Sequence, residues 1–271
     1  MFCMRLLPFV FLVLSVGFSN GQSADSIRNH YIKSYPDKFF LWPVLKQRTL
    51  TFELQNPNQL GNTVRFRPNN SYELGVGMYL FDLGLELVFA IPVKENAFGQ
   101  TSAEDLQLNI ISRKWGGDIF YQHYDGFYLS NPDSPLGPDG VYPQRPDIET
   151  RNVGLSAFYV FNSSKFSLRS AFTFADRQLR SAGSFLVSTG FNSFSLKADS
   201  AILNKHYASR IGMSNPFTSL DNQTFSIAPG YAYNFIIRRN FFFSASLVLG
   251  PAIQWLNYED VQGLNHSHNT V

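Results

Sequence analysis

The chain has 271 residues, of which 15% are charged and 16% aromatic, and its 22 Lys and Arg nearly balance its 20 Asp and Glu. This balance gives no electrostatic support for nucleic-acid binding, and a mean hydropathy of −0.11 is not that of a helical membrane protein. The single cysteine, Cys3, lies in the first few residues, so no disulfide is expected within the folded chain.

Residues 1–21 have the pattern of a secretory signal peptide. Arg5 precedes an apolar run at 6–16, and the small residues Ser19 and Gly21 suit a cleavage site that makes Gln22 the first mature residue. The apolar run is too short to remain as a spanning helix, and no later run reaches the roughly 18 apolar residues that such a helix needs. We therefore expect either a soluble exported protein or an outer-membrane β-barrel.

Residues 72–91 carry the clearest strand signal. Apolar residues alternate with small and acidic ones over two segments of about ten residues, with a break at Phe81 and Asp82 between them. Glycines and glutamates occupy the second face, where a soluble sheet would carry lysine, threonine and arginine. Apolar side chains outward and small or polar ones inward are typical of a transmembrane barrel strand, although an ordinary half-buried hairpin has a related pattern.

The same alternation continues along the chain. It predicts further strands at 48–56, 104–115, 118–129, 151–161, 166–175, 181–191, 194–202, 223–235 and 241–256. Short turns and longer loops alternate between these strands, as they do between the periplasmic and outer ends of a barrel. The proline-rich stretch 130–150 is one of the expected outer loops.

The predicted fold class is therefore all-β, an antiparallel up-and-down transmembrane β-barrel of about 12 strands. Eleven strands are visible in the pattern, so either the closing strand is truncated or the turn predicted at 192–193 is absent. The predicted organisation is a signal peptide (1–21), an N-terminal periplasmic segment (22–47), the barrel (48–256), and a polar tail or the start of a closing strand (257–271).

Several short motifs, taken in their order, resemble an uncharacterised family. They are Tyr35-Pro36-Asp37-Lys38, Arg67-Pro68-Asn69, Tyr121-Gln122-His123-Tyr124-Asp125-Gly126-Phe127-Tyr128, Tyr159-Val160-Phe161-Asn162, Arg177-Gln178-Leu179-Arg180-Ser181-Ala182-Gly183-Ser184 and Pro229-Gly230-Tyr231. The resemblance is to a Bacteroidota family of outer-membrane β-barrels, domain of unknown function family 4421. It implies a location and a fold, and it supplies no catalytic residues.

Charged side chains on the inward face form the first set of candidate site residues. In a narrow barrel they would pair and fill the lumen, and in a wider one they would line a channel. We expect a filled lumen, because unpaired buried charges are costly. The predicted network consists of Glu73, Glu86, Asp105, Arg113, Arg169 and Lys197.

A second set of candidates is the pair Arg177 and Arg180, in a short polar segment that the alternation of turns places outside the cell. Guanidinium groups bind phosphate well, so these residues are candidates for contact with lipopolysaccharide; a solvated loop is the alternative. The expected partners are outer-membrane lipid and lipopolysaccharide and the barrel-assembly machinery, with no nucleic acid.

An enzyme and a metal protein are both considered and not favoured. A membrane-embedded lipid hydrolase would need His123, near Asp125, to meet Ser170 or Ser184 at one rim. Because no Gly-X-Ser-X-Gly motif occurs, we expect no catalytic residues. Three other histidines lack the cysteine partners and helical spacing of zinc ligands, so no metal and no cofactor is expected; these are His206, His266 and His268.

The expected function is that of a protein of the cell outer membrane, with a structural, binding or small-solute transport role. The lipid hydrolase is one alternative. A soluble secreted β-protein that binds an apolar ligand is the other.

Overall fold

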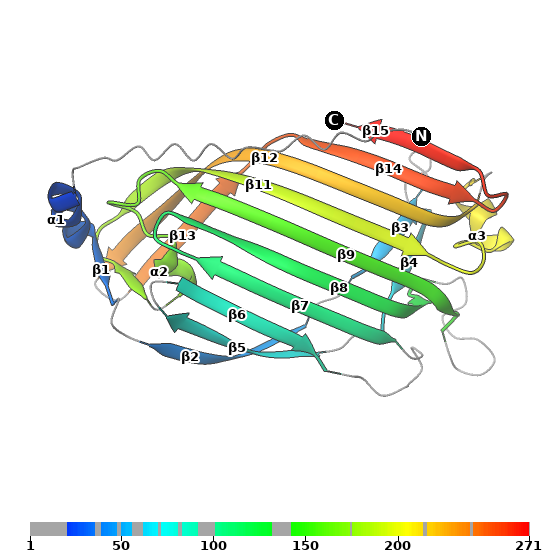
Figure 1. Cartoon of the computed structure of the whole chain (residues 1–271), viewed down its shortest axis with the longest axis horizontal. Helices are drawn as coiled ribbons and strands as arrows, with labels where there is room; N and C mark the ends of the chain where they lie inside the picture. Colours follow the sequence, from blue (N-terminus) through cyan, green and yellow to red (C-terminus); the bar gives the residue numbers. More distant parts are fainter. Residues whose placement is uncertain are drawn as a thin grey trace, which may run out of the picture.

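The computed structural model describes residues 21–35, 39–47, 50–55, 62–69, 72–80, 83–91, 101–131, 142–173, 175–213, 216–238 and 241–270. Within these residues the chain is almost entirely antiparallel β-sheet, with three short helices (Figure 1). None of the helices in the described ranges is long and apolar enough to cross a membrane.

The elements follow one another along the chain. They are α1 (Gly21–Tyr31), β1 (Ile32–Ser34), β2 (Phe40–Gln47), β3 (Phe52–Gln55), β4 (Thr63–Arg67), β5 (Tyr72–Leu80), β6 (Leu83–Ala90), β7 (Ser102–Ile111), β8 (Trp115–Leu129), β9 (Gln144–Val160), α2 (Arg169–Phe172), β10 (Asp176–Gln178), β11 (Ala182–Lys197), α3 (Lys205–Arg210), β12 (Phe217–Arg238), β13 (Phe241–Val248), β14 (Ala252–Asp260) and β15 (Asn265–Thr270).

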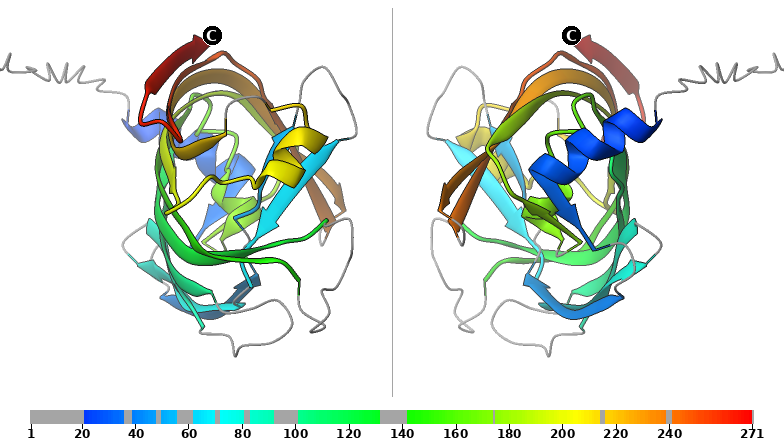
Figure 2. Two further views of the ribbon diagram at one scale, coloured as in Figure 1. Left: turned by 90° about the vertical axis from the view of Figure 1, so that its right-hand side faces the viewer. Right: turned by 90° about the vertical axis from the view of Figure 1, so that its left-hand side faces the viewer.

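The long strands form one sheet in the order β2-β5-β6-β7-β8-β9-β11-β12-β14-β15, and β13 pairs with β12 beside β14. Each long strand therefore lies beside the long strands that precede and follow it in the chain, which confirms the predicted antiparallel, all-β arrangement. Viewed from its ends, the sheet curves around an interior (Figure 2), as the right-handed twist of strands favours. Among the described residues no pairing joins β2 to β13 or β15.

A row of apolar side chains crosses the outer face of this sheet near the middle of the strands. Neighbouring members are opposed on adjacent strands. They are Pro43, Val76, Leu87, Leu108, Ile119, Leu155, Phe191, Phe225 and Ile253. All of these side chains except the half-buried Leu108 are exposed although apolar; Leu155, for example, is 53% accessible. The outward direction of the apolar face, predicted from the alternation, is thus confirmed for these strands.

The same outer face becomes polar toward the end of the sheet that carries α3, which we call the α3 end. Two successive rows of paired residues there are polar on every strand that contributes to them. The first is Glu104, His123, Arg151, Ser195, Asp221, Asn257 and Ser267, and the second is Ser102, Asp125, Glu149, Lys197, Ser219, Glu259 and Asn265.

At the opposite end, which we call the α1 end, the outer face is aromatic. Trp115 opposes Tyr159 on β8 and β9, and Phe185 opposes Tyr231 on β11 and β12. All four rings are exposed. The outer surface is therefore banded, with an aromatic edge, an apolar middle and a charged edge.

Both ends of the interior are occupied by chain. At the α3 end the β3–β4 hairpin packs under the sheet, where Phe66 is 0% exposed and belongs to a buried cluster with Phe127, Ile148 and Ile211. At the α1 end, β1 pairs with β10 beside α2.

Two predicted boundaries were wrong near the C-terminal half, and the structure also decides between the tail and the strand that were both predicted for 257–271. Residues 192–193 are not a turn, because Asn192 pairs with Gly154 on one side and Thr224 on the other within the continuous strand β11. Residues 166–175 are not a strand, because α2 lies there. The tail 257–271 completes β14 and forms β15; its polar composition reflects its position in the two polar outer rows.

Two further differences concern prolines and the first strand. The sheet begins at β2 rather than at 48–56. Pro43 is tolerated because β2, within the part of the chain that the structure describes, pairs on one side only, with β5. Strand β3 is short and pairs with β4 outside the main order.

Strand β9 extends back to Gln144 through Pro146, which lies where the β8–β9 register shifts between Asp125 and Phe127. The rest of the predicted loop, at 132–141, lies outside the described residues.

Candidate functional site in the interior

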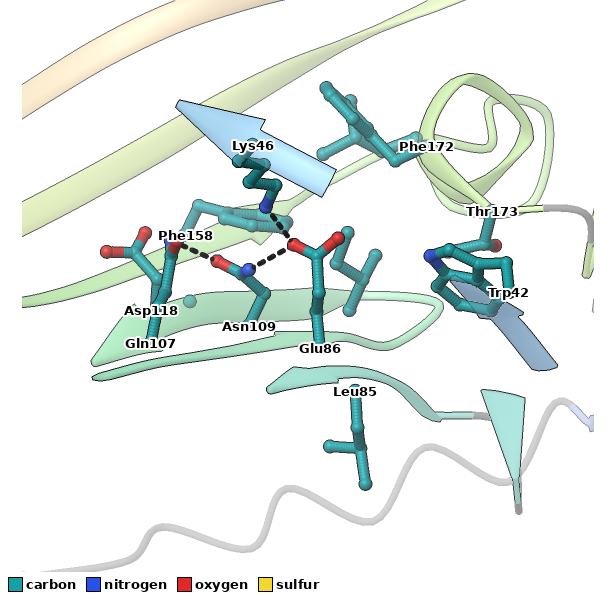
Figure 3. A pocket seen from close by; sticks show the side chains of 13 residues that line it. Trp42, Lys46, Leu85, Glu86, Gln107, Asn109, Asp118, Phe158, Phe172 and Thr173 are labelled. Carbon is teal, nitrogen blue, oxygen red and sulfur yellow. Dashed lines mark hydrogen bonds and ion pairs between the residues drawn. The ribbon is translucent and has the colours of Figure 1, made fainter. Parts of the chain in front are cut away.

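A chamber of about 400 Å³ lies inside the curved sheet. Strands β2, β6, β7, β8 and β9 and the helix α2 supply its lining (Figure 3). The lining residues are Trp42, Lys46, Leu85, Glu86, Gln107, Asn109, Ile111, Gly117, Asp118, Phe158, Leu168, Phe172 and Thr173. It combines carboxylates and amides with three aromatic rings, and its size lies within the range of small-molecule pockets.

The floor of the chamber follows from strand register. One inward row of opposed residues runs across nine strands. It is Trp42, Gly77, Glu86, Asn109, Asp118, Ser156, Gly190, Ser226 and Ala252. The row lies one residue away from the apolar outer row, so the same strands carry both. The predicted contrast between an apolar outer face and a small or polar inner face is present here.

Glu86 is the centre of the hydrogen-bond network in the chamber. Lys46 forms an ion pair with its carboxylate, and Asn109 Nδ2 donates to Glu86 Oε2 over 2.8 Å. Gln107 Nε2 donates in turn to Asn109 Oδ1, also over 2.8 Å (Figure 3). The Lys46 side chain is 35% accessible and that of Glu86 is 19% accessible. Because both side chains are partly accessible to solvent, breaking this pair should cost less free energy than breaking a fully buried pair.

Glycines in the floor make room for aromatic rings from neighbouring strands. A Cβ at Gly77 would lie 1.9 Å from the Trp42 indole, and one at Gly116 would lie 2.4 Å from Phe158. The rings can lie flat against the backbone only because these positions have no side chain. The inward glycines that suggested a lumen therefore have a specific function in packing.

We expect Gly77→Ala to lower the free energy of unfolding by about 1–3 kcal/mol, because Trp42 must leave its position. The control is Gly190→Ala in the same row, where the new Cβ would meet only the Ser226 hydroxyl at 3.2 Å and Leu155 O at 3.9 Å. Thermal unfolding with tryptophan fluorescence measures both variants. Equal effects of the two substitutions would contradict the packing of Trp42 on Gly77.

A second inward ladder of polar side chains lies between the chamber and the α3 end. Asp105 accepts hydrogen bonds from Gln122 Nε2 at 2.7 Å and from the Tyr124 hydroxyl at 3.0 Å. Asn152 Nδ2 donates to Gln122 Oε1 at 3.0 Å, and Asn192 Nδ2 donates to Asn152 Oδ1 at 2.7 Å. Four strands are thus linked by side chains across the interior, and Asp105 is buried in this ladder.

The α1 end contains the most buried ion pair among the described residues. Arg169 Nη2 lies 2.7 Å from Asp176 Oδ1, and the two side chains are 1% and 0% accessible. Arg28 of α1 adds a second cation, 2.9 Å from Asp176 Oδ2. Ser167 Oγ donates to the same carboxylate, and Arg169 donates to the Tyr79 hydroxyl at 3.0 Å. The network joins helix α1, helix α2, β10 and β5.

The charges around Asp176 determine its protonation. Burial by itself raises the pKa of this carboxyl, but the hydrogen bonds and charge of Arg169 and the hydrogen bond from Ser167 outweigh it, so the pKa lies below the ordinary value. Asp176 lies in β10, within the connection between β9 and β11. It is therefore ionised, and it forms ion pairs with two buried arginines.

The other predicted members of the network have different positions. Glu73 is buried at 2% exposure and lies opposite Lys46 on β5 and β2. Arg113 lies in the turn between β7 and β8, where its charge acts on Arg28. Lys197 was assigned to the wrong face: it follows the buried Leu196 and is exposed on the outer face. The error came from the turn predicted at 192–193, which treated one continuous strand as two.

The predicted outer-loop position of Arg177 and Arg180 is also wrong. Both are exposed, and Arg177 opposes Lys33 on β10 and β1, at the same end as α1. The prediction required residues 166–175 to cross the sheet as a strand, and they do not. These two arginines therefore lie at the same end as the short β7–β8 turn, and the argument for lipopolysaccharide contact does not apply to them.

The histidine and serines of the hydrolase alternative lie far apart. His123 belongs to the row that contains Ser195, near the α3 end, whereas Ser184 lies eleven residues further along β11. At about 3.3 Å per residue this is about 36 Å. Ser170 donates to Ser167 O in helix α2, also near the α1 end. The structure does not bring together the groups that this reaction requires.

His123 has two acidic neighbours instead. Its Nε2 atom lies 3.2 Å from Asp125 Oδ2, and its Nδ1 atom lies 3.7 Å from Glu149 Oε1. The sequence placed Asp125 near His123 but could not reveal Glu149, which the β8–β9 register brings in. Of the other histidines, His206 lies in α3. His266, in β15, lies 3.1 Å from the carboxylate of Asp260, at the end of β14.

One comparison with known proteins found a match, and it extends over nearly the whole chain. Among curated proteins no match is found, and no solved structure matches either. The model of one family, described as a domain of unknown function (DUF4421), matches residues 23–271. The matched region includes the curved sheet, the chamber and the network around Asp176. The chain therefore belongs to the DUF4421 family, whose function is unknown.

Proposed function

We propose that this protein is an outer-membrane β-barrel with a largely filled lumen, and that its role is structural or in binding rather than in steady ion conduction. Export would use the signal peptide predicted at residues 1–21. The observation that carries the proposal is the apolar outer row across nine strands, beside an inner row of polar and small residues on the same strands. Sheets in water have the apolar face inward, and membrane barrels have it outward.

The spacing of the outer bands supports a membrane location. On β9 the charged Arg151 and the aromatic Tyr159 are eight residues apart and face outward, with Val153, Leu155 and Ala157 between them. Eight residues at about 3.3 Å span about 26 Å along the strand, and at a tilt of about 40° this length rises about 20 Å along the membrane normal. The surface of such barrels has an apolar band about 25 Å tall with aromatic edges, which is of comparable height. Lipid would cover the band, lipopolysaccharide would contact the polar edge, and the barrel-assembly machinery would insert the chain.

The contents of the interior support a filled lumen. The hydrophobic cluster under β3 and β4 occupies one end, and the network of Arg28, Arg169 and Asp176 occupies the other. Between them, side chains of Asp105, Gln122 and neighbouring residues bridge the strands. The chamber lies between these regions, and its aromatic and polar lining suits a small polar solute.

The test begins with expression of the full chain with its signal peptide, followed by membrane fractionation. We expect the protein in the outer-membrane fraction, a migration in gels that changes on heating, and no steady conductance in planar bilayers. Recovery as a soluble periplasmic protein without heat-dependent migration would favour the soluble apolar-ligand binder. Outer-membrane location with steady conductance would contradict the filled lumen and make transport the leading function.

A further inference from the structure

The outer face at the α3 end holds a histidine between two carboxylates. His123 and Asp125 lie two residues apart on β8 and therefore share a face, and Glu149 lies directly opposite Asp125 on β9. One ligand atom from each of the three residues can be chosen so that all lie within 4.8 Å of one another. The side chains of Asp125 and Glu149 are 46% and 43% accessible, so the group is open to solvent.

Two features of this group indicate a missing cation. Carboxylates directly opposite each other on paired strands repel, and Asp125 and Glu149 are such a pair. In addition, the Nδ1 atom of His123 is buried and has no hydrogen-bond partner. A positive ion between the three groups would relieve the repulsion and satisfy that nitrogen.

The charged side chains around this group do not fully balance its negative charge. Arg151 Nη2 lies 3.4 Å from Glu149 Oε1, and this ion pair partly compensates the charge of that carboxylate. Lys197 opposes Glu149 on β11, and Glu104 opposes His123 on β7. The two cations are therefore matched against three carboxylates. The charged side chains around His123 therefore leave the group with a net negative charge.

We propose that His123, Asp125 and Glu149 form a binding site for a divalent transition-metal ion, with Zn²⁺ as the best fit. Zinc binds one imidazole nitrogen and carboxylate oxygens at about 2.0–2.2 Å, which requires ligand atoms about 3.3–3.5 Å apart. An ion can bind only one of the two ring nitrogens, and the unpartnered Nδ1 atom of His123 lies 3.7 Å from Glu149 Oε1, close to this separation. Rotation of the half-exposed Asp125 side chain supplies the remaining approach.

The chemistry of the ligands selects the class of metal. Imidazole favours zinc, copper and nickel, whereas calcium and magnesium prefer sites made only of oxygen. Three protein ligands leave a fourth position, which water would fill. The site lies outside the chamber and depends on β8 and β9 only, so it does not rest on the proposed membrane function.

The experiment measures Zn²⁺ affinity of the purified, folded full chain in detergent, by competition with a chromophoric chelator. We expect His123→Ala and Glu149→Gln each to weaken binding by more than about tenfold, the lower limit seen even for losses in the outer shell of metal sites. His266→Ala is the matched control, because the His266–Asp260 contact has no third ligand among the described residues. It should leave the affinity unchanged.

Further measurements distinguish loss of the metal site from misfolding of a variant, and a transition-metal site from a calcium site. Heat-dependent gel migration identifies any variant that fails to fold. If His123→Ala does not fold, Glu149→Gln still tests the site, because glutamine preserves the shape of the side chain. Co²⁺ should give visible absorption with the wild type and the His266→Ala variant, and little with the others. No Zn²⁺ binding by the wild type, or equal affinity in all variants, would overturn the proposal. So would displacement of Zn²⁺ by an equal concentration of Ca²⁺.

Discussion

Replacing Asp176 with asparagine is expected to lower the free energy of unfolding by about 3–5 kcal/mol, the range for removing one partner of a buried ion pair. The substitution preserves the shape of the side chain and removes its charge. Arg169, which is 1% exposed, would then lose its ion pair with Asp176, and Arg28 would lose the same partner. Denaturant-induced unfolding of the purified protein in detergent measures the loss.

The matched control is Glu53→Gln, which removes the partner of Arg65 in an ion pair whose side chains are 39% and 38% accessible. Exposed pairs are worth about 0–1 kcal/mol, so this variant should unfold nearly as the wild type does. Similar small losses for both variants would contradict the structural importance of the network at the α1 end.

The same carboxylate predicts a dependence of stability on pH. The pKa of Asp176 lies below its ordinary value of 3.8 in the folded chain. A depressed pKa means that the stabilisation is present above the ordinary value and is lost as the pH falls through the folded-state pKa. The difference between wild type and Asp176→Asn should therefore be largest near neutral pH and shrink below about pH 4. A difference that stays constant on acidification would contradict this assignment.

Leu155→Arg is expected to prevent most of the protein from assembling in the outer membrane. Leu155 lies in the middle of the apolar outer row, with Ile119 and Phe191 opposite it on the adjacent strands. Arginine on the lipid face at the midplane of a membrane costs about 2–4 kcal/mol, and the cost falls to about 0–1 kcal/mol near the edge. The fraction of heat-modifiable protein in outer membranes measures assembly.

Ser195→Arg provides the control for this experiment. Ser195 faces outward on the neighbouring strand but lies in the polar row beside Arg151 and Asp221. It introduces the same side chain on the same face at a different depth, and we expect normal assembly. If both variants assemble equally well, the apolar row does not lie in a membrane, because an exposed arginine is harmless to a soluble sheet.

The alternation of side chains was predictable because it is a local property. In a strand, successive residues point to opposite faces, so residues 72–91 by themselves indicated which face is apolar. The same reasoning placed Glu86 inward, as the structure has it. Strand ends were less predictable where polar residues form part of a strand. For the segment 257–271 the sequence left a tail and a closing strand open, because β15 lies entirely in the polar edge, where no alternation of apolar residues marks it.

The tertiary structure decided which groups meet. Lys46 and Glu86 are 40 residues apart and pair only because β2, β5 and β6 lie side by side in one register. Asp176 lies 148 residues from Arg28. Shifting any strand by one residue would turn its whole inward set to the outer face, so such pairings depend on the register of every intervening strand. The alternation, which needs only neighbouring residues, determined the two faces, and long-range pairing determined the chamber, the buried ion pair and the group around His123.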